Sequence, residues 1–236
     1  MDWLIPDFAD SDGNLKGVVQ SFLIKSGKNN ILIDTCIGNG KKTGYQPWDE
    51  LKSNFLTRLG NICAKDKINI VINTHFHGDH IGWNTVKKNR EYVPTFQNAE
   101  YVMVKKEFDY IKAGNSDDFN NSVLPVVNCG LVRFVDWKYK IDENVSLFPA
   151  PGHTPYHVGI MIKSKNQSAV ISGDLFHHPC EITHPEWTTD CEFDKNALIN
   201  SRLSLLQKLA NKNIIFIGSH FARAGKIIKD DYYSLI

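Results

Sequence analysis

The first third of the chain alternates apolar, strand-like runs with polar turns. Residues 18–24 and 30–34 are mostly apolar, and the polar turn at 25–29 between them is typical of a β-hairpin. Residues 68–72, Ile-Asn-Ile-Val-Ile, are nearly all apolar, as expected of a strand that is covered on both faces. The pattern predicts a sheet whose buried strand ends just before a histidine.

The rest of the chain combines further strands with helices. Apolar side chains at every fourth position predict a helix over 48–59, and Asp194 can cap a second helix that extends to Leu209. A last apolar strand is predicted at 214–217. A second group of short strands is predicted at residues 132–135, 145–149, 159–163 and 168–172.

These elements predict an α/β protein with a layered sandwich architecture. Polar residues gather where predicted strands end, so we expect a site along one edge of the layers. The 236 residues contain no Pro/Ser-rich linker, low-complexity tract or short repeat. We therefore expect a single domain, 1–236, made of two sheet-and-helix halves at approximately 1–140 and 141–236.

Composition narrows the classes of partner. The formal net charge is +1 and no dense Lys/Arg tract occurs, which disfavours nucleic acid. No stretch has the length of a membrane span, and no basic, apolar leader is visible, so we expect no membrane partner. Five scattered cysteines without a Cys-x-x-Cys pair indicate a reducing, cytoplasmic setting. The expected partner is a small-molecule substrate, with a homodimer as an open option.

The segment His75-Phe76-His77-Gly78-Asp79-His80 carries the densest chemistry in the sequence. On an extended backbone His75 and His77 point the same way and can bind one metal ion. A turn at Gly78 would direct Asp79 and His80 toward a second ion. The alternative is a polar loop whose histidines only bond to backbone carbonyls.

Three further candidates each follow a predicted strand: His153, Asp174 and His220, with His157 close behind the first. Glycines before or near them allow the backbone to turn toward the sheet edge. Any one of them alone is better explained as a structural histidine or a turn aspartate. Together with the cluster at 75–80 they predict a metal centre.

These residues resemble the metallo-β-lactamase superfamily, whose signature is His-x-His-x-Asp-His followed by a histidine, an aspartate and a histidine. The resemblance implies a four-layered αββα sandwich with the active site at the edge between the two sheets. It implies that one metal is held by His75, His77 and His153. The other is then held by Asp79, His80 and His220, with Asp174 bridging the two.

The resemblance also implies two divalent cations as cofactors. Three imidazoles and carboxylate oxygens suit zinc, with iron, manganese or cobalt as feasible substitutes. Such a pair activates a bridging water as hydroxide and polarises a carbonyl or phosphoryl oxygen, so we expect hydrolysis. Asp79 is expected to orient the hydroxide or carry its proton. Asp34 resembles an aspartate that supports a ligating histidine, with an ordinary turn aspartate as the alternative.

Within the family, the segments 34–39, 80–84 and 173–179 resemble the lactonase and organophosphate-hydrolase branch, which includes methyl parathion hydrolase-like enzymes. An aspartate at 174 argues against β-lactamases that place a cysteine on the second metal. Lactonases of this branch carry a tyrosine three residues after the bridging aspartate, where this chain has His177. We expect His177 to donate a hydrogen bond to an oxyanion, or else to be a surface or supporting histidine. His178 is expected to have little effect.

The predicted function is a binuclear metal-dependent hydrolase that opens a lactone or small ester by hydroxide attack. Phosphotriester, aryl ester and thioester hydrolysis by the same fold are the nearest alternatives. A different class, a di-iron redox protein, uses a similar ligand set. Such proteins normally need a flavin domain, for which this chain has no room.

Overall fold

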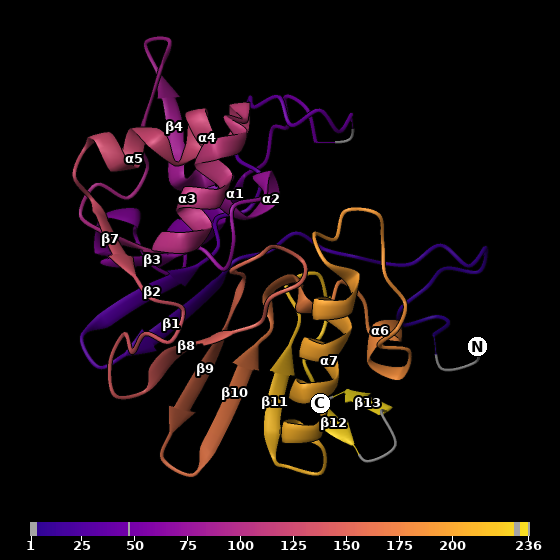
Figure 1. Ribbon diagram of the computed structural model, residues 1–236. Coiled ribbons are helices and arrows are strands. Elements are labelled where there is room, and N and C mark those ends of the chain that lie inside the picture. Colours follow the sequence, from indigo (N-terminus) through magenta and orange to yellow (C-terminus); the bar gives the residue numbers. More distant parts are fainter. Residues whose placement is uncertain (1–3, 47, 229–231, 236) are drawn as a thin grey trace. The chain divides into compact units, whose positions relative to one another are not determined.

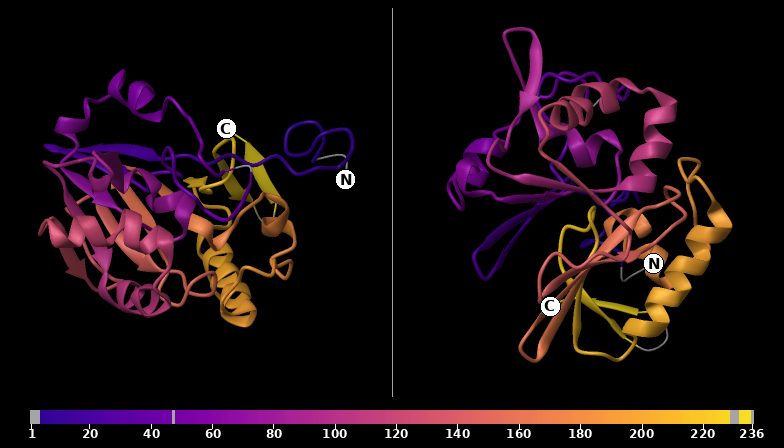
Figure 2. Two further views of the ribbon diagram at one scale, coloured as in Figure 1. Left: turned by 90° about the horizontal axis from the view of Figure 1, so that it is seen from above. Right: turned by 60° about the vertical axis from the view of Figure 1, so that its left-hand side comes forward.

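The chain forms two compact units in a computed structural model that describes residues 4–46, 48–228 and 232–235. The middle unit is Gln20–Asp136, and the flanking unit combines Met1–Val19 with Trp137–Ile236. Figures 1 and 2 show the ribbon of both. Among the described residues, no helix has both the length and the apolar character needed to cross a membrane.

The middle unit is built on a five-stranded sheet with the strand order β1-β2-β3-β6-β7. Strands β1 and β2 form an antiparallel hairpin, and the remaining neighbours pair in parallel. Its helices and strands are β1 Phe22–Ser26, β2 Asn29–Ile33, α1 Phe55–Gly60, η1 Lys65–Lys67, β3 Ile70–Ile72, α2 Gly78–Ile81, η2 Gly82–Asn84, β4 Thr85–Lys88, β5 Glu91–Pro94, β6 Glu100–Val104, α3 Lys105–Gly114, α4 Asp117–Ser122, α5 Leu124–Asn128 and β7 Val132–Val135.

The core of the middle unit lies between this sheet and its helices. Apolar side chains of the strands, such as Val71 and Met103, are fully buried against Phe108 of α3, Phe119 of α4 and Val126 of α5. Burial of such side chains supplies most of the stabilisation of a sheet and helix layer. The core therefore fixes β3, and with it the start of the histidine segment that follows.

The flanking unit is built on a six-stranded sheet with the order β13-β12-β11-β10-β9-β8. Strands β10 and β11 pair in parallel, and the other neighbours pair antiparallel. Its helices and strands are β8 Val145–Pro149, β9 Val158–Ser164, β10 Gln167–Ile171, η3 Gly173–Leu175, α6 Cys180–Thr183, α7 Lys195–Leu209, β11 Ile214–Ile217, β12 Gly225–Ile228 and β13 Tyr232–Leu235.

Helix α7 lies along one face of this sheet (Figures 1 and 2). Its first turn is capped by Asp194, whose carboxylate accepts a hydrogen bond from the backbone N–H of Ala197. Leu198, Leu205 and other buried residues of α7 pack with Val170 and Phe216 of the strands. The cap and the apolar side of this helix match the sequence pattern.

Two elements differ from the prediction. The helix expected over 48–59 is shortened to Phe55–Gly60, because Asp49 accepts hydrogen bonds from the backbone of Thr43 and Gly44, and Glu50 has a positive φ of 54°. The strand at 132–135, grouped with the later strands, pairs instead with β6 in the first sheet. Parallel pairing there requires the α3–α5 crossover, which the apolar pattern alone did not reveal.

Candidate metal centre

The histidine segment of the middle unit begins where β3 ends. His77 has extended backbone angles and directly precedes α2, which carries Asp79 and His80. The ring centroids of His75 lie 4.6 Å from those of His77 and 4.1 Å from those of His80. The distance from His80 Nε2 to Asp79 Oδ2 is 3.4 Å. The structure thus brings together the four candidates of this segment.

Asp34, at the end of β2, organises the rings of this group. Its carboxylate accepts hydrogen bonds from the backbone N–H and the hydroxyl of Thr74, at 2.8 and 2.9 Å, and lies 2.9 Å from His80 Nδ1. Because Thr74 gives its hydroxyl proton to Asp34, it accepts a hydrogen bond from His75 Nδ1 at 3.1 Å. Asp34 therefore supports a candidate ligand, which is the first of the two alternatives left open by the sequence.

In the flanking unit, Asp174 lies among three histidines. Its Oδ2 atom is 3.1 Å from His220 Nε2, 3.5 Å from His153 Nε2 and 3.6 Å from His177 Nε2. Gly173 precedes it with a φ of 58°, which is the left-handed conformation that glycine adopts without strain. The structure brings together all the candidates that this unit contributes.

Two of these histidines are oriented by partners at Nδ1. His153 Nδ1 lies 2.8 Å from Glu192 Oε2, and His220 Nδ1 lies 2.8 Å from the carbonyl oxygen of Val18. Both partners accept hydrogen bonds, which places the proton on Nδ1 and the lone pair on Nε2. The hydrogen bond to His153 lowers the pKa of Glu192 although burial opposes this.

His157, also a candidate, has a supporting place instead. It is fully buried, its Nδ1 donates to the carbonyl of Ala150, and its Nε2 accepts a hydrogen bond from the backbone N–H of Asp174, both at 3.0 Å. With both ring nitrogens used in this way, His157 positions the backbone of Asp174.

His177 and His178 face different surroundings. His177 Nδ1 lies 3.7 Å from carboxylate oxygens of both Glu181 and Glu192. Burial alone would lower the pKa of His177, but Asp174 and Glu181 raise it well above its usual value. His178 is buried, and its Nε2 donates to the carbonyl of Phe8 at 2.9 Å.

Sequence reasoning missed Glu192 and did not use Cys191 in the site. Ligand atoms of His153, His177, Cys191 and Glu192 all lie within 4.8 Å of one another. Cys191 is exposed, whereas Glu192 is buried. No motif marks Glu192, because its contact with His153 spans 39 positions of the chain.

The donor set of each unit fits divalent cations. Two atoms that bind one ion at about 2.0–2.2 Å in tetrahedral geometry lie about 3.4 Å apart, close to the separations around Asp79 and Asp174. His75, His80, His153 and His220 each have Nδ1 next to an acceptor, which directs Nε2 to act as the ligand atom. This is the arrangement expected of metal-binding histidines.

Comparison with known families agrees with the motifs. A sequence model of the metallo-β-lactamase superfamily matches residues 15–218. An N-acyl homoserine lactonase of Bacillus sp. is 26% identical over 131 residues, which are 56% of this chain and 40% of that protein. The chain thus spans about two fifths of the length of this relative.

Solved structures agree in fold. AidC, a dizinc quorum-quenching lactonase in complex with N-hexanoyl-homoserine product, has a TM-score of 0.73 at 24% identity, covering 93% of this chain and 79% of its own. AbOPH, a hydrolase in the β-lactamase superfamily, has a TM-score of 0.81 at 19% identity, covering 100% of this chain and 84% of its own. The predicted fold and the resemblance to the lactonase branch are confirmed.

Proposed function

Because the chain belongs to the metallo-β-lactamase superfamily, we propose that it is a binuclear metal-dependent hydrolase that opens a lactone or small ester. The observation that carries this proposal is the orientation of the candidate ligands. Four histidines, two in each unit, carry an acceptor at Nδ1 and present Nε2. His157 has a similar orientation, but its Nε2 accepts a hydrogen bond from the backbone N–H of Asp174, so it has a supporting role.

We assign the ligands by the pattern of the family. Imidazole and carboxylate donors suit zinc, and iron, manganese or cobalt are substitutes. One ion is assigned to His75, His77 and His153, and the other to Asp79, His80 and His220, with Asp174 bridging.

When bound, two divalent ions would supply an activated water and polarise the carbonyl oxygen of the substrate. Asp79 is assigned to hold the proton of this water, since its carboxylate sits beside His80 within the ligand segment. His177 is assigned to donate a hydrogen bond to the oxyanion, in the place of the tyrosine found in lactonases. Asp174 and Glu181 raise the pKa of His177, which favours the form of the ring that donates hydrogen bonds.

Similarity to lactonases favours a lactone or small ester as substrate. Aryl esters, phosphotriesters and thioesters are the nearest alternatives. A di-iron redox protein is the alternative from a different class, because it would use the same kinds of ligand.

The test measures metal content and hydrolysis together on the purified chain. Lactones, aryl esters, a phosphotriester, a thioester and a bis-aryl phosphodiester are supplied as substrates. We expect two zinc ions per chain and a preference for lactones or esters. Two irons without hydrolysis would favour the redox alternative.

The variant Asp174→Ala tests the bridging assignment. We expect it to abolish turnover and to lower metal content while the circular dichroism spectrum of the sheets is kept. Asp190→Ala, an exposed position in the same unit, is the control and should keep both. Unchanged turnover in the Asp174 variant would remove the bridging role.

A further inference from the structure

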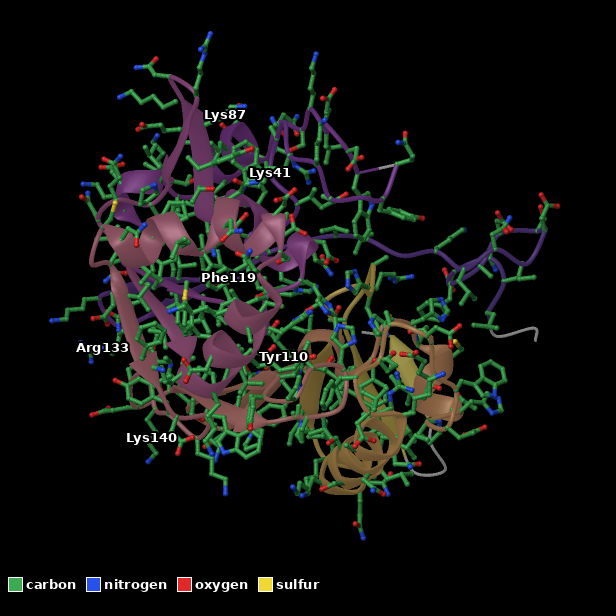
Figure 3. The ribbon with its side chains drawn as sticks, turned by 45° about the horizontal axis from the view of Figure 1, so that its top comes forward. Lys41, Lys87, Tyr110, Phe119, Arg133 and Lys140 are labelled. Atoms are coloured by element: carbon green, nitrogen blue, oxygen red, sulfur yellow. The ribbon has the colours of Figure 1, made fainter. Side chains whose placement is uncertain are left out.

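A buried polar cluster of the middle unit has no part in the proposed metal centre. Lys41 is only 2% exposed, and its Nζ donates hydrogen bonds to Thr85 Oγ1 at 2.9 Å and Ser122 Oγ at 2.6 Å. The ammonium also lies 5.1 Å from the ring centroid of Tyr92. Lys41, labelled in Figure 3, is thus an amine held inside the unit next to α4.

Asp118 lies on α4 near this amine. It precedes Ser122 by four residues, which places both side chains on the same side of the helix. Two contacts fix the position of this helix. Ser116 caps its first turn, and Phe119 is buried in the core. Burial raises the pKa of Asp118, and the nearby Lys41 opposes this increase.

The carboxylate of Asp118 lies directly over Gly78, between the candidate ligands His77 and Asp79. A Cβ atom added to Gly78 would lie 2.6 Å from Asp118 Oδ2 and 3.0 Å from its Cγ. The φ of Gly78 is not in the left-handed region, so its backbone conformation does not require glycine. A side chain at this position would meet the Asp118 carboxylate, which would have to move away.

This carboxylate also has unused hydrogen-bonding capacity. It is half-buried, yet no donor in the part of the chain that the structure describes is hydrogen bonded to either oxygen. Neither oxygen is among the fully buried unpartnered side-chain atoms, so both are open to solvent and a substrate donor can reach them. Lys41 lies nearby, but its hydrogen bonds go to Thr85 and Ser122.

We infer that Asp118 is a specificity-determining residue that accepts a hydrogen bond from a hydroxyl or amide N–H next to the scissile carbonyl of the substrate. This inference rests on the proposed hydrolysis, since it places the reacting carbonyl at the metals that His77 and Asp79 would bind. The same carboxylate disfavours substrates with an anionic group at that position, through repulsion of like charges.

The test compares two lactones that differ in one donor, α-hydroxy-γ-butyrolactone and α-methoxy-γ-butyrolactone. The wild-type chain should prefer the hydroxy compound in kcat/KM. Asp118→Ala should reduce this preference by about tenfold, mainly through KM, because a hydrogen bond to a charged group is lost. Asp118→Asn keeps an acceptor oxygen and should retain part of the preference.

Asp117→Ala is the matched control, because Asp117 lies in the same helical turn but is exposed. It should keep the wild-type preference for the hydroxy compound. That result would show that the loss of one negative charge from α4 does not by itself change the preference. An Asp118→Ala variant with the same preference as wild type would overturn the inference.

Gly78→Ala provides a second, independent measurement. Its new Cβ must displace the Asp118 carboxylate, so it should reduce the same preference when Asp118 is present. In the Asp118→Ala background it should cause no further reduction, since the two changes act on one contact. Two fully additive reductions would contradict the assignment.

Failure of the proposed function would be seen separately. If the wild-type chain hydrolysed no lactone, the dissociation constants of both lactones for the zinc-loaded protein would be measured by calorimetry. A tighter Kd for the hydroxy compound that is lost in Asp118→Ala supports the role of Asp118 in recognition. Equal Kd ratios in both proteins overturn it.

Discussion

Four of the candidate ligand histidines are each oriented by a single hydrogen bond at the Nδ1 atom. Glu192 is the partner of His153, and removing such a partner typically costs 10- to 100-fold in metal affinity. We expect Glu192→Ala to weaken zinc binding by about that factor. Competition with a chelator would measure it. Glu186→Ala, at an exposed position, should bind zinc like wild type, and equal affinities for all three proteins would argue against the role of Glu192.

His178 contributes to stability rather than to turnover. It is buried, donates to Phe8 and accepts from the backbone N–H of Cys180. We expect His178→Ala to lower the free energy of unfolding by about 1–3 kcal/mol, since buried partners are left unsatisfied. Urea denaturation would measure this, with kcat close to wild type. We therefore still expect a change at His178 to have little effect on activity, and we now also expect it to reduce stability.

Lys41 makes stability depend on pH. Burial lowers its pKa from 10.5 to about 7, against the opposing effect of Asp118. Between these values the unfolded chain holds a proton that the folded chain lacks, so the contribution of Lys41 to the unfolding free energy rises with pH and is lost as pH falls toward 7.

The variant Lys41→Met removes this contribution. From pH 7.5 to 9.5, the unfolding free energy of wild type should rise relative to the variant by about 2 kcal/mol. Denaturant titrations at the two pH values provide the measurement. Lys42→Met, at the exposed neighbouring position, should follow wild type, and parallel pH profiles of wild type and Lys41→Met would contradict the buried-amine explanation.

At the scale of residues, the candidate ligands could be predicted from the sequence, but the groups that hydrogen bond to them could not. His75 to His80 form a dense local motif, and Asp174 and His220 follow apolar strands, so local patterns suffice to find them. Val18 contacts His220 across 202 positions, and Asp118 reaches Gly78 only because α4 packs on α2. Contacts of this kind are created by tertiary structure, which no local pattern encodes.

At the scale of elements, α7 is joined to the segment after Asp174 by a buried arginine. Arg202 is fully buried, donates to the carbonyls of Leu175, Pro185 and Trp187, and pairs with Glu181 at 2.9 Å. Glu181 in turn accepts a hydrogen bond from the backbone N–H of His177. One side chain of the helix therefore fixes the segment that carries His177.

Removing this arginine should be costly. We expect Arg202→Met to lower the free energy of unfolding by about 3–5 kcal/mol, because buried Glu181 loses its guanidinium partner and three carbonyls lose their donor. Thermal or urea unfolding would measure it. Arg223→Met, which breaks an exposed pair with Asp7, should cost at most about 1 kcal/mol, and similar losses in both variants would refute the distinction.

Strands and helices were predicted unequally well. The strands at 132–135, 145–149 and 214–217 have the expected bounds, because each is a short, mostly apolar segment. The strand β6 and the helices α3 to α5 were not foreseen. Helix α3 has few buried positions, so its apolar pattern is weak.

At the scale of the whole molecule, the superfamily fold was predicted from seven polar residues and is confirmed. The single domain and the homodimer stay predictions. The approximate halves at 1–140 and 141–236 did not assign the first nineteen residues to the later half, where Val18 and Phe8 make their contacts. The composition of residues 4–19 does not indicate which part of the chain they pack against.

The flanking unit combines both ends of the chain, and this determines the order in which the two units can fold during synthesis. The middle unit can complete its sheet once residue 136 has left the ribosome, so His75 to His80 are in place early. Residues 4–19 must wait for strands made later, and His220 receives its Val18 partner only near the end of translation. At about 5–20 residues per second this delay lasts several seconds or more. The candidate ligands of the flanking unit can therefore be complete only after synthesis of residue 220, so we expect any metal binding that needs them to be a late maturation step.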